Sequence, residues 1–137
     1  MTKKQVDTKK KKKIVKLPSL NLAKIIAKLS SDKKAEDIVI LDVRKVSSFC
    51  DFFVIMTGNV EVHIESLKEH IITSLKRNYN IYPHHVEGEE YNRWVVIDYI
   101  SVVVHIMNPE LREFYALERI WAKGKKVSYD KKSKKNI

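Results

Sequence analysis

Three residues in the second half of the chain, Trp94, Asp98 and His105, have side chains that could do chemistry or hold a partner. An aspartate beside a histidine is an acid–base pair, and tryptophan is enriched among the side chains that anchor protein partners. Alternation along a strand places Trp94 and Asp98 on one face of a sheet. Because a charged aspartate is costly to bury without a partner, we expect that face to be at least partly accessible. This favours a docking surface, with a core role for Trp94 and a local hydrogen bond for Asp98 as the alternative.

The residues that follow predict a β-hairpin that brings His105 to the same face. With a two-residue turn at Ile100-Ser101, Asp98 pairs with Val103 and Val96 pairs with His105. A type I′ turn needs positive φ, which a β-branched isoleucine resists. The geometry of the turn is therefore not predicted, and an exposed isoleucine there would add apolar contact to a partner.

The other histidines do not predict a metal site. His84 and His85 are neighbours on a strand, so their side chains point to opposite faces and cannot both reach one ion. The spacing of these residues with Glu87 and His105 matches no familiar zinc pattern. The chain has three glycines and no glycine-rich phosphate loop. We therefore expect neither a metal nor a cofactor.

The elements that position these residues follow one another in a mixed order of helices and strands. Apolar spacing and turn residues predict a helix from Ser19 to about 30, strands at 38–43 and 51–57, a helix at 60–77, an edge strand at 81–86, strands at 93–99 and 102–107, and a helix from Pro109 until Gly124. Ser19 and Asn108 are the expected caps of the first and last helices. This order predicts an α/β fold with one mixed sheet of about five strands flanked by helices.

The net charge of +10 is concentrated at the two ends of the chain. Residues 1–18 contain eight lysines and one acidic residue, and residues 124–137 contain six lysines and one acidic residue. We expect both segments to be flexible tails around a folded domain at 19–123. Lysine blocks favour polyanions such as RNA, in contacts that carry no sequence information. The alternative is that the lysines only promote solubility.

The single cysteine, Cys50, lies among phenylalanines and is expected to be a small buried residue. One cysteine excludes an internal disulfide and fits a reducing, cytoplasmic compartment. The longest apolar runs are far shorter than the roughly 20 residues that span a bilayer. We therefore expect no membrane association.

A series of motifs between Leu20 and Trp121 closely resembles the ribosomal silencing factor family, also called Iojap-like proteins. The motifs are Asp42-Val43-Arg44, Ser47-Ser48-Phe49-Cys50-Asp51-Phe52-Phe53-Val54-Ile55, Thr57-Gly58-Asn59, His85-Val86-Glu87-Gly88, Arg93-Trp94-Val95-Val96-Ile97-Asp98-Tyr99, Val102-Val103-Val104-His105-Ile106 and Arg112-Glu113-Phe114-Tyr115-Ala116-Leu117-Glu118-Arg119-Ile120-Trp121. Family members commonly have Gly-Asp in the hairpin turn, where this chain has Ile100-Ser101.

The resemblance implies a nucleotidyltransferase-like fold without established transferase activity. It implies a repressor that binds the large ribosomal subunit through its L-fourteen protein and blocks joining of the small subunit when nutrients are scarce. Relatives in organelles act in large-subunit biogenesis, so the alternative is a biogenesis factor that contacts ribosomal RNA through its lysine tails. A homodimer formed through the sheet is a further option.

The nucleotidyltransferase-like fold prompts a test for catalysis. Metal-assisted phosphoryl transfer commonly needs two or more carboxylates. In that fold they stand as acid-x-acid at the start of a helix, after a Gly-Ser turn. Here Glu61 follows Gly58-Asn59, and His63 stands where the second acid would be. One carboxylate with a histidine is a poor magnesium site, so we expect no enzyme activity.

The hairpin and the last helix together supply the predicted partner-binding residues. They are Trp94, Asp98, Tyr99, Ile100, Val103, His105, Arg112, Glu113 and Tyr115. Arginine offers a planar fork to carboxylates, so a pairing of Arg112 or Glu113 across the interface is expected. The alternative is an ordinary exposed helix.

Overall fold

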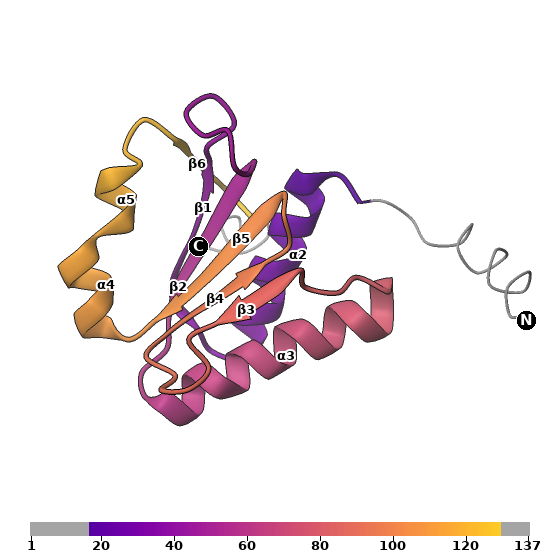
Figure 1. The fold of residues 1–137 in the computed structure, drawn as a ribbon, viewed down its shortest axis with the longest axis vertical. Coiled ribbons are helices and arrows are strands. Elements are labelled where there is room, and N and C mark those ends of the chain that lie inside the picture. Colours follow the sequence, from indigo (N-terminus) through magenta and orange to yellow (C-terminus); the bar gives the residue numbers. More distant parts are fainter. Residues whose placement is uncertain (1–16, 130–137) are drawn as a thin grey trace, which may run out of the picture.

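A six-stranded mixed sheet with helices on both faces forms the frame of the protein (Figure 1). The computed structural model describes residues 17–129, so most of both expected tails lies outside the described residues. The elements are α2 (Ser19–Asp32), β1 (Glu36–Asp42), β2 (Phe52–Thr57), α3 (Glu61–Tyr79), β3 (His85–Glu87), β4 (Trp94–Asp98), β5 (Val102–Met107), α4 (Pro109–Tyr115), α5 (Leu117–Ile120) and β6 (Lys125–Val127). The predicted α/β class is confirmed, with six strands in place of about five.

The strands lie in the order β3-β4-β5-β2-β1-β6. β2 and β5 are parallel, and the other neighbouring pairs are antiparallel. The hairpin of β4 and β5 has the predicted register, with Asp98 opposite Val103 and Val96 opposite His105. β3 is an edge strand, as expected, but it begins after Pro83, which has no N–H to donate to the ladder.

The helices α2 and α3 cover one face of the sheet and form the main core with it (Figure 1). Their apolar residues recur every three or four positions, so that Ile26, Ile64 and Ile71 fall on the inner sides and are fully buried. These side chains belong to one cluster with Val54 and Ile97 of the sheet. Residues two apart on a strand share a face, so the intervening side chains point to the opposite face.

On that opposite face, α4 and α5 cover only part of the sheet (Figure 1). Leu117 and the partly buried Trp121 pack there in a smaller cluster with Leu41 and Ile55, from the β1 and β2 side. The side chains of β4 and β5 on this face, such as Val96 and Val103, are only partly buried. The sheet therefore has one fully covered face and one half-covered face.

The last helix was expected to run unbroken to Gly124, but the structure divides it into α4 and α5. Its start matches the prediction, because the Asn108 side chain accepts a hydrogen bond from the Leu111 N–H and Pro109 is at the first position. It then ends at Tyr115, because Ala116 has a φ of 43°. The left-handed residue redirects the chain and turns Leu117 into the smaller core cluster. An alanine gives no sequence signal for such a break, which usually occurs at glycine.

The segment expected to be the C-terminal tail contains a strand. β6 pairs with β1, with Lys125 opposite Asp42 and Val127 opposite Ile40. Gly124 allows this approach, since a Cβ there would lie 3.0 Å from the carbonyl oxygen of Asp42. Val127 packs against the main core. The predicted domain end at residue 123 was therefore too early.

The ends of α2 and α3 differ in small ways from the prediction. The cap position of α2 is Pro18 and not Ser19, whose hydroxyl instead donates to the Asp51 carboxylate at 2.8 Å. α3 continues two residues past the predicted end at 77 and stops at a left-handed Asn80. Of the helices in the described part of the chain, none is long and apolar enough to cross a membrane.

Candidate functional site

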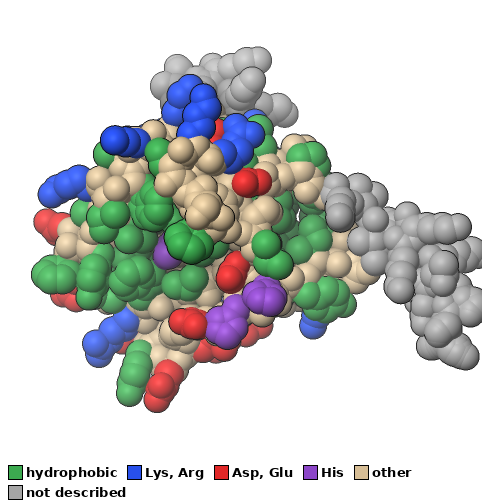
Figure 2. Space-filling model, turned by 45° about the horizontal axis from the view of Figure 1, so that its top comes forward, with side chains coloured by type: hydrophobic (Ala, Val, Ile, Leu, Met, Phe, Trp, Pro, Cys, Tyr) green, Lys and Arg blue, Asp and Glu red, His purple; other side chains and the backbone are tan. Residues whose placement is uncertain are grey.

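The half-covered face of the sheet carries a partly exposed aromatic surface, which we call the aromatic face. Figure 2 shows hydrophobic side chains gathered over the side of the molecule that bears α4 and α5. The aromatic face is formed by β2, β4, β5, the hairpin turn and α4. Its residues are Phe53, Trp94, Val96, Asp98, Ile100, Val103, His105, Phe114 and Tyr115. The strand register explains the grouping, since Asp98, Val103 and Phe53 lie in one row across three strands, and Val96 and His105 lie in the next.

Trp94 is held in place from two sides. Its Nε1–H donates to Nδ1 of His105 at 3.1 Å. The ring of Tyr115 lies against it, with centroids 5.0 Å apart at 47°. A large aromatic side chain that is fixed before binding loses little entropy when a partner arrives. The Trp94 ring is thus preorganised and is the candidate anchor of this face, where the structure brings together the predicted Trp94, His105 and Tyr115.

His105 is a neutral support for this anchor. Its Nδ1 accepts the indole proton, and its ring meets the edge of Phe53 at a centroid distance of 5.2 Å. Burial lowers the pKa of His105 to about 4, because the charged form is poorly solvated there. A histidine that stays neutral at pH 7 and uses one ring nitrogen as a structural acceptor suits a packing role better than proton transfer.

Asp98 shares the face with Trp94 and His105, but its side-chain hydrogen bond is local. Oδ1 accepts from the backbone N–H of Ile100 at 2.7 Å. The alternative that we considered for Asp98, a local acceptor, is therefore the arrangement observed. Asp98 fixes the hairpin turn and remains partly exposed, at the opposite end of β4 from Trp94. The three residues share a face without forming an aspartate–histidine pair.

The hairpin turn is a tight γ-turn and not a type I′ turn. The Ser101 N–H donates to the Tyr99 carbonyl at 2.8 Å, and Ile100 between them has a φ of 72°. This conformation is strained for a β-branched residue. It places the Ile100 side chain in solvent, 62% exposed, at the end of the aromatic face.

Tyr99 lies on the opposite, helix-covered face. It is 7% exposed and belongs to the main core, where burial raises the pKa of its hydroxyl. Strand alternation had already separated it from Trp94. We therefore leave Tyr99 out of the docking surface.

Arg112 also proves to be internal. Its Nε donates to Glu118 Oε2 at 3.1 Å and its Nη1 donates to Thr57 Oγ1 at 2.8 Å. Its side chain is only 12% exposed. These bonds tie α4 to α5 and to the end of β2, so Arg112 positions the helix and does not offer a fork to a partner. Glu113, next to it, is exposed.

Phe114, which is 76% exposed, is not among the partner-binding residues predicted from the sequence. Its ring packs edge-on against Tyr115, with centroids 4.9 Å apart, and so extends the aromatic face along α4. No residue of α4 is buried. Two adjacent aromatics at a helix end were the available signal.

The start of α3, where a phosphoryl-transfer site would be expected in this fold, is fixed by hydrogen bonds. His63 uses both ring nitrogens, since Nδ1 accepts from the Asn59 N–H at 3.1 Å and Nε2 lies 2.9 Å from the Lys33 carbonyl oxygen. Glu61 lies 3.9 Å from Arg93, with both side chains largely exposed. Within residues 17–129, no three histidine, cysteine or acidic side chains converge as metal ligands would. Cys50 is buried and burial raises its pKa to about 11, so its thiol is a poor nucleophile.

Comparison with known proteins decides the family. The family model described as "Ribosomal silencing factor during starvation" matches residues 16–137. The chain belongs to the ribosomal silencing factor family.

Similarity to individual proteins spans most of the described domain. The ribosomal silencing factor of Bacillus subtilis is 35% identical over 101 residues, which are 74% of this chain and 85% of that protein. The mouse protein named "Mitochondrial assembly of ribosomal large subunit protein 1" is 30% identical over 100 residues, 71% of this chain and 43% of that protein. A crystal structure of a Chromobacterium violaceum protein superimposes with a TM-score of 0.74 at 29% identity, covering 82% of this chain and 92% of that one.

Proposed function

We propose that this chain is a translational repressor that binds the large ribosomal subunit through its L-fourteen protein. Bound there, it blocks joining of the small subunit and silences translation under nutrient limitation. It acts in the cytoplasm, as a binding protein and not as an enzyme. Family membership supports a ribosomal role, in silencing or in large-subunit assembly.

The observation that carries the proposal is the aromatic face with its fixed tryptophan. Trp94 is locked by His105 and Tyr115, Phe114 packs on Tyr115 and is 76% exposed, and Ile100 is 62% exposed at the other end of the face. Aromatic anchors surrounded by apolar and polar contacts are typical of protein–protein hot spots. A face of this composition suits an apolar surface of a folded protein better than RNA, since it is mainly aromatic and aliphatic and the charged member of the face, Asp98, is negative.

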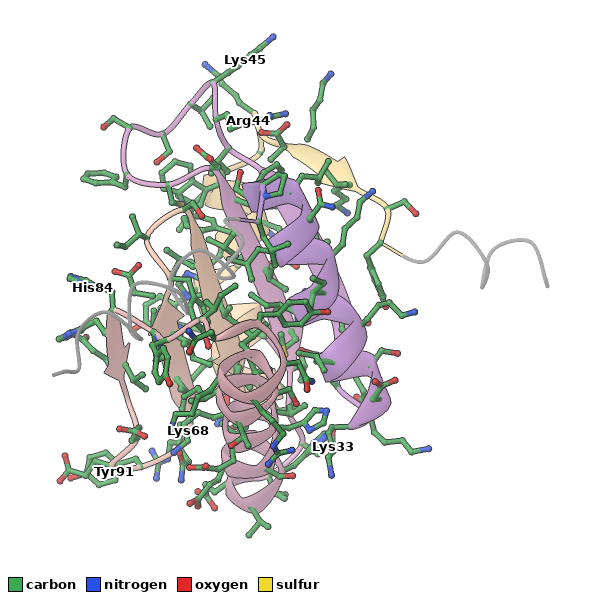
Figure 3. The ribbon with its side chains drawn as sticks, turned by 90° about the vertical axis from the view of Figure 1, so that its right-hand side faces the viewer. Lys33, Arg44, Lys45, Lys68, His84 and Tyr91 are labelled. Atoms are coloured by element: carbon green, nitrogen blue, oxygen red, sulfur yellow. The ribbon has the colours of Figure 1, made fainter. Side chains whose placement is uncertain are left out.

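Measured affinity for the purified L-fourteen protein tests the docking assignment. We expect Phe114→Ser to weaken binding about tenfold or more, because the exposed ring is lost from the interface. Tyr91→Ser is the matched control, since Tyr91 is 68% exposed and lies at the edge of the molecule labelled in Figure 3. Equal affinities for both variants and the parent chain would remove the aromatic face from the proposal.

A second candidate function is large-subunit biogenesis. The mouse relative is named for assembly of the large subunit, and the lysine-rich ends of this chain are suited to ribosomal RNA. This role predicts that deletion of residues 1–16 lowers affinity for immature large subunits and flattens the salt dependence of binding. A deletion that changes neither quantity would reduce this segment to an accessory.

The aromatic face also suits a second copy of the chain. If a homodimer forms there, Phe114→Ser converts it to a monomer in analytical ultracentrifugation and Tyr91→Ser does not. Binding of the ribosomal protein and self-association would then compete for one surface.

A further inference from the structure

A basic pocket lies at one end of the sheet, away from the anchor residues of the aromatic face. It has a volume of about 220 Å³ and is lined by Asp42, Arg44, Lys45, Val46, Lys123 and Lys125. Arg44 and Lys45 lie together at one end of the molecule, opposite the end that carries Lys33 (Figure 3). Lys and Arg side chains also gather at the top of the view in Figure 2.

Two segments, residues 42–46 and 123–125, build this pocket. Asp42 ends β1, Arg44 and Lys45 follow it in the next loop, and Lys123 and Lys125 flank the turn into β6. The turn can come this close because it contains Gly124, whose Cβ would meet the Asp42 carbonyl oxygen at 3.0 Å. Pairing of Lys125 with Asp42 in the sheet then fixes the spacing of the cations.

The one carboxylate in the pocket is already neutralised. Arg44 Nε and Nη2 donate to the two Asp42 oxygens at 2.9 and 2.7 Å. These bonds hold the pKa of Asp42 below its usual value, and Lys125 adds to the effect. The Arg44 guanidinium also lies over the Phe52 ring at 5.1 Å, which fixes its orientation while its Nη1 is used in neither bond. Lys45, Lys123 and Lys125 therefore leave an excess of positive charge.

We propose that this pocket binds the phosphodiester backbone of RNA, with Lys45, Lys123 and Lys125 as the phosphate contacts and Arg44 as a fixed guide. That the polyanion is RNA rests on the proposed ribosomal function; the phosphate chemistry rests on the pocket itself. The contacts would position the protein without reading sequence. They would give a second, electrostatic attachment beside the apolar one.

A polymer fits the arrangement better than a single small anion. Three exposed lysines, Lys45, Lys123 and Lys125, line the pocket together around the end of β1. Several neighbouring cations match the repeated charges of a nucleic-acid backbone, and they gain affinity by releasing several condensed counterions.

Fluorescence anisotropy of a short labelled RNA of mixed sequence, with the full chain, tests this. The pocket variant combines Lys45→Gln, Lys123→Gln and Lys125→Gln. The control variant combines Lys28→Gln, Lys33→Gln and Arg77→Gln, three exposed positions on α2, its end and α3, and changes the net charge equally. We expect at least about tenfold weaker binding for the pocket variant, with a salt slope smaller by about 2, and about twofold or less for the control.

Equal losses in the two variants would overturn the proposal, because net charge or the lysine-rich ends would then account for binding. Perturbation of the pocket amides by inorganic phosphate, with unchanged RNA affinity in the pocket variant, would also overturn it in favour of a small anion. Urea unfolding checks that both variants fold. Since naked RNA is the probe, failure here leaves the proposed function intact, and loss of ribosomal binding would leave this result standing.

Discussion

At the scale of single residues, Trp94 and its two neighbours explain how one aromatic side chain becomes a fixed anchor. The sheet register brings His105 within hydrogen-bond distance, and α4 supplies Tyr115. Alternation along the strands could predict that Trp94, Asp98 and His105 share a face, because the period of a strand is two. It could not predict that the aspartate would bond its own turn, since that depends on the conformation of Ile100.

The neutral state of His105 predicts a pH dependence of stability. Its pKa is lowered to about 4 when folded, against an ordinary value near 6.5, so the unfolded chain binds more protons between these values. Stability is therefore lost as pH falls from about 6.5 towards 4. The parent chain should lose unfolding free energy between pH 7.5 and pH 5. In His105→Gln we expect this loss to be smaller by roughly 2 kcal/mol, measured by urea unfolding. Identical pH profiles for both proteins would show that His105 is not held neutral.

The strained turn predicts a stabilising substitution. Ile100→Gly removes the penalty of a β-branched residue at a φ of 72°, offset in part by the entropy of glycine. We expect the free energy of unfolding to rise by about 1 kcal/mol. Ser101→Gly is the control, because its φ is not positive and glycine gains nothing there. A loss of stability in Ile100→Gly equal to that in the control would contradict the assigned turn.

At the scale of elements, the break between α4 and α5 shapes the half-covered face. The hairpin, the helices α2 and α3 and the edge position of β3 were predictable, because apolar periodicity and turn residues are local signals. The break at Ala116 and the strand β6 were not. An alanine carries no preference for positive φ, and a lysine-rich segment gains its place in the sheet only through contact with β1 and the main core.

The link between α4 and the rest of the protein depends on Arg112. Burial opposes ionisation of Glu118, but hydrogen bonds from Arg112 outweigh it and hold the pKa of the carboxyl below its usual value. Arg112→Ala leaves this partly buried carboxylate without its partner, so we expect a loss of about 3 kcal/mol in unfolding free energy. Arg119→Ala, at an exposed position, should change it by about 0.5 kcal/mol or less. Similarly small changes in unfolding free energy for both variants would show that the ion pair of Arg112 with Glu118 does not hold α4 and α5 in place.

At the scale of the whole molecule, the sheet has one face covered by α2 and α3 and one half-covered face, which we propose as the docking surface. The partner-binding residues predicted from the sequence include most of the aromatic face, and also Tyr99 and Arg112, which the structure places in internal contacts. The contact between Arg112 and Thr57 joins residues 55 positions apart, and such tertiary partners leave no local pattern. The basic pocket could not be predicted for the same reason, because its lysines come from two segments far apart in the sequence.

The most direct test of the central claim is sucrose-gradient sedimentation of purified large and small ribosomal subunits with this protein. We predict that the parent chain migrates with the large subunit and reduces the peak of joined ribosomes. Phe114→Ser should restore that peak, whereas Tyr91→Ser should behave like the parent chain. An undiminished peak of joined ribosomes, with the parent chain bound to the large subunit or absent from it, would contradict the proposed block of subunit joining.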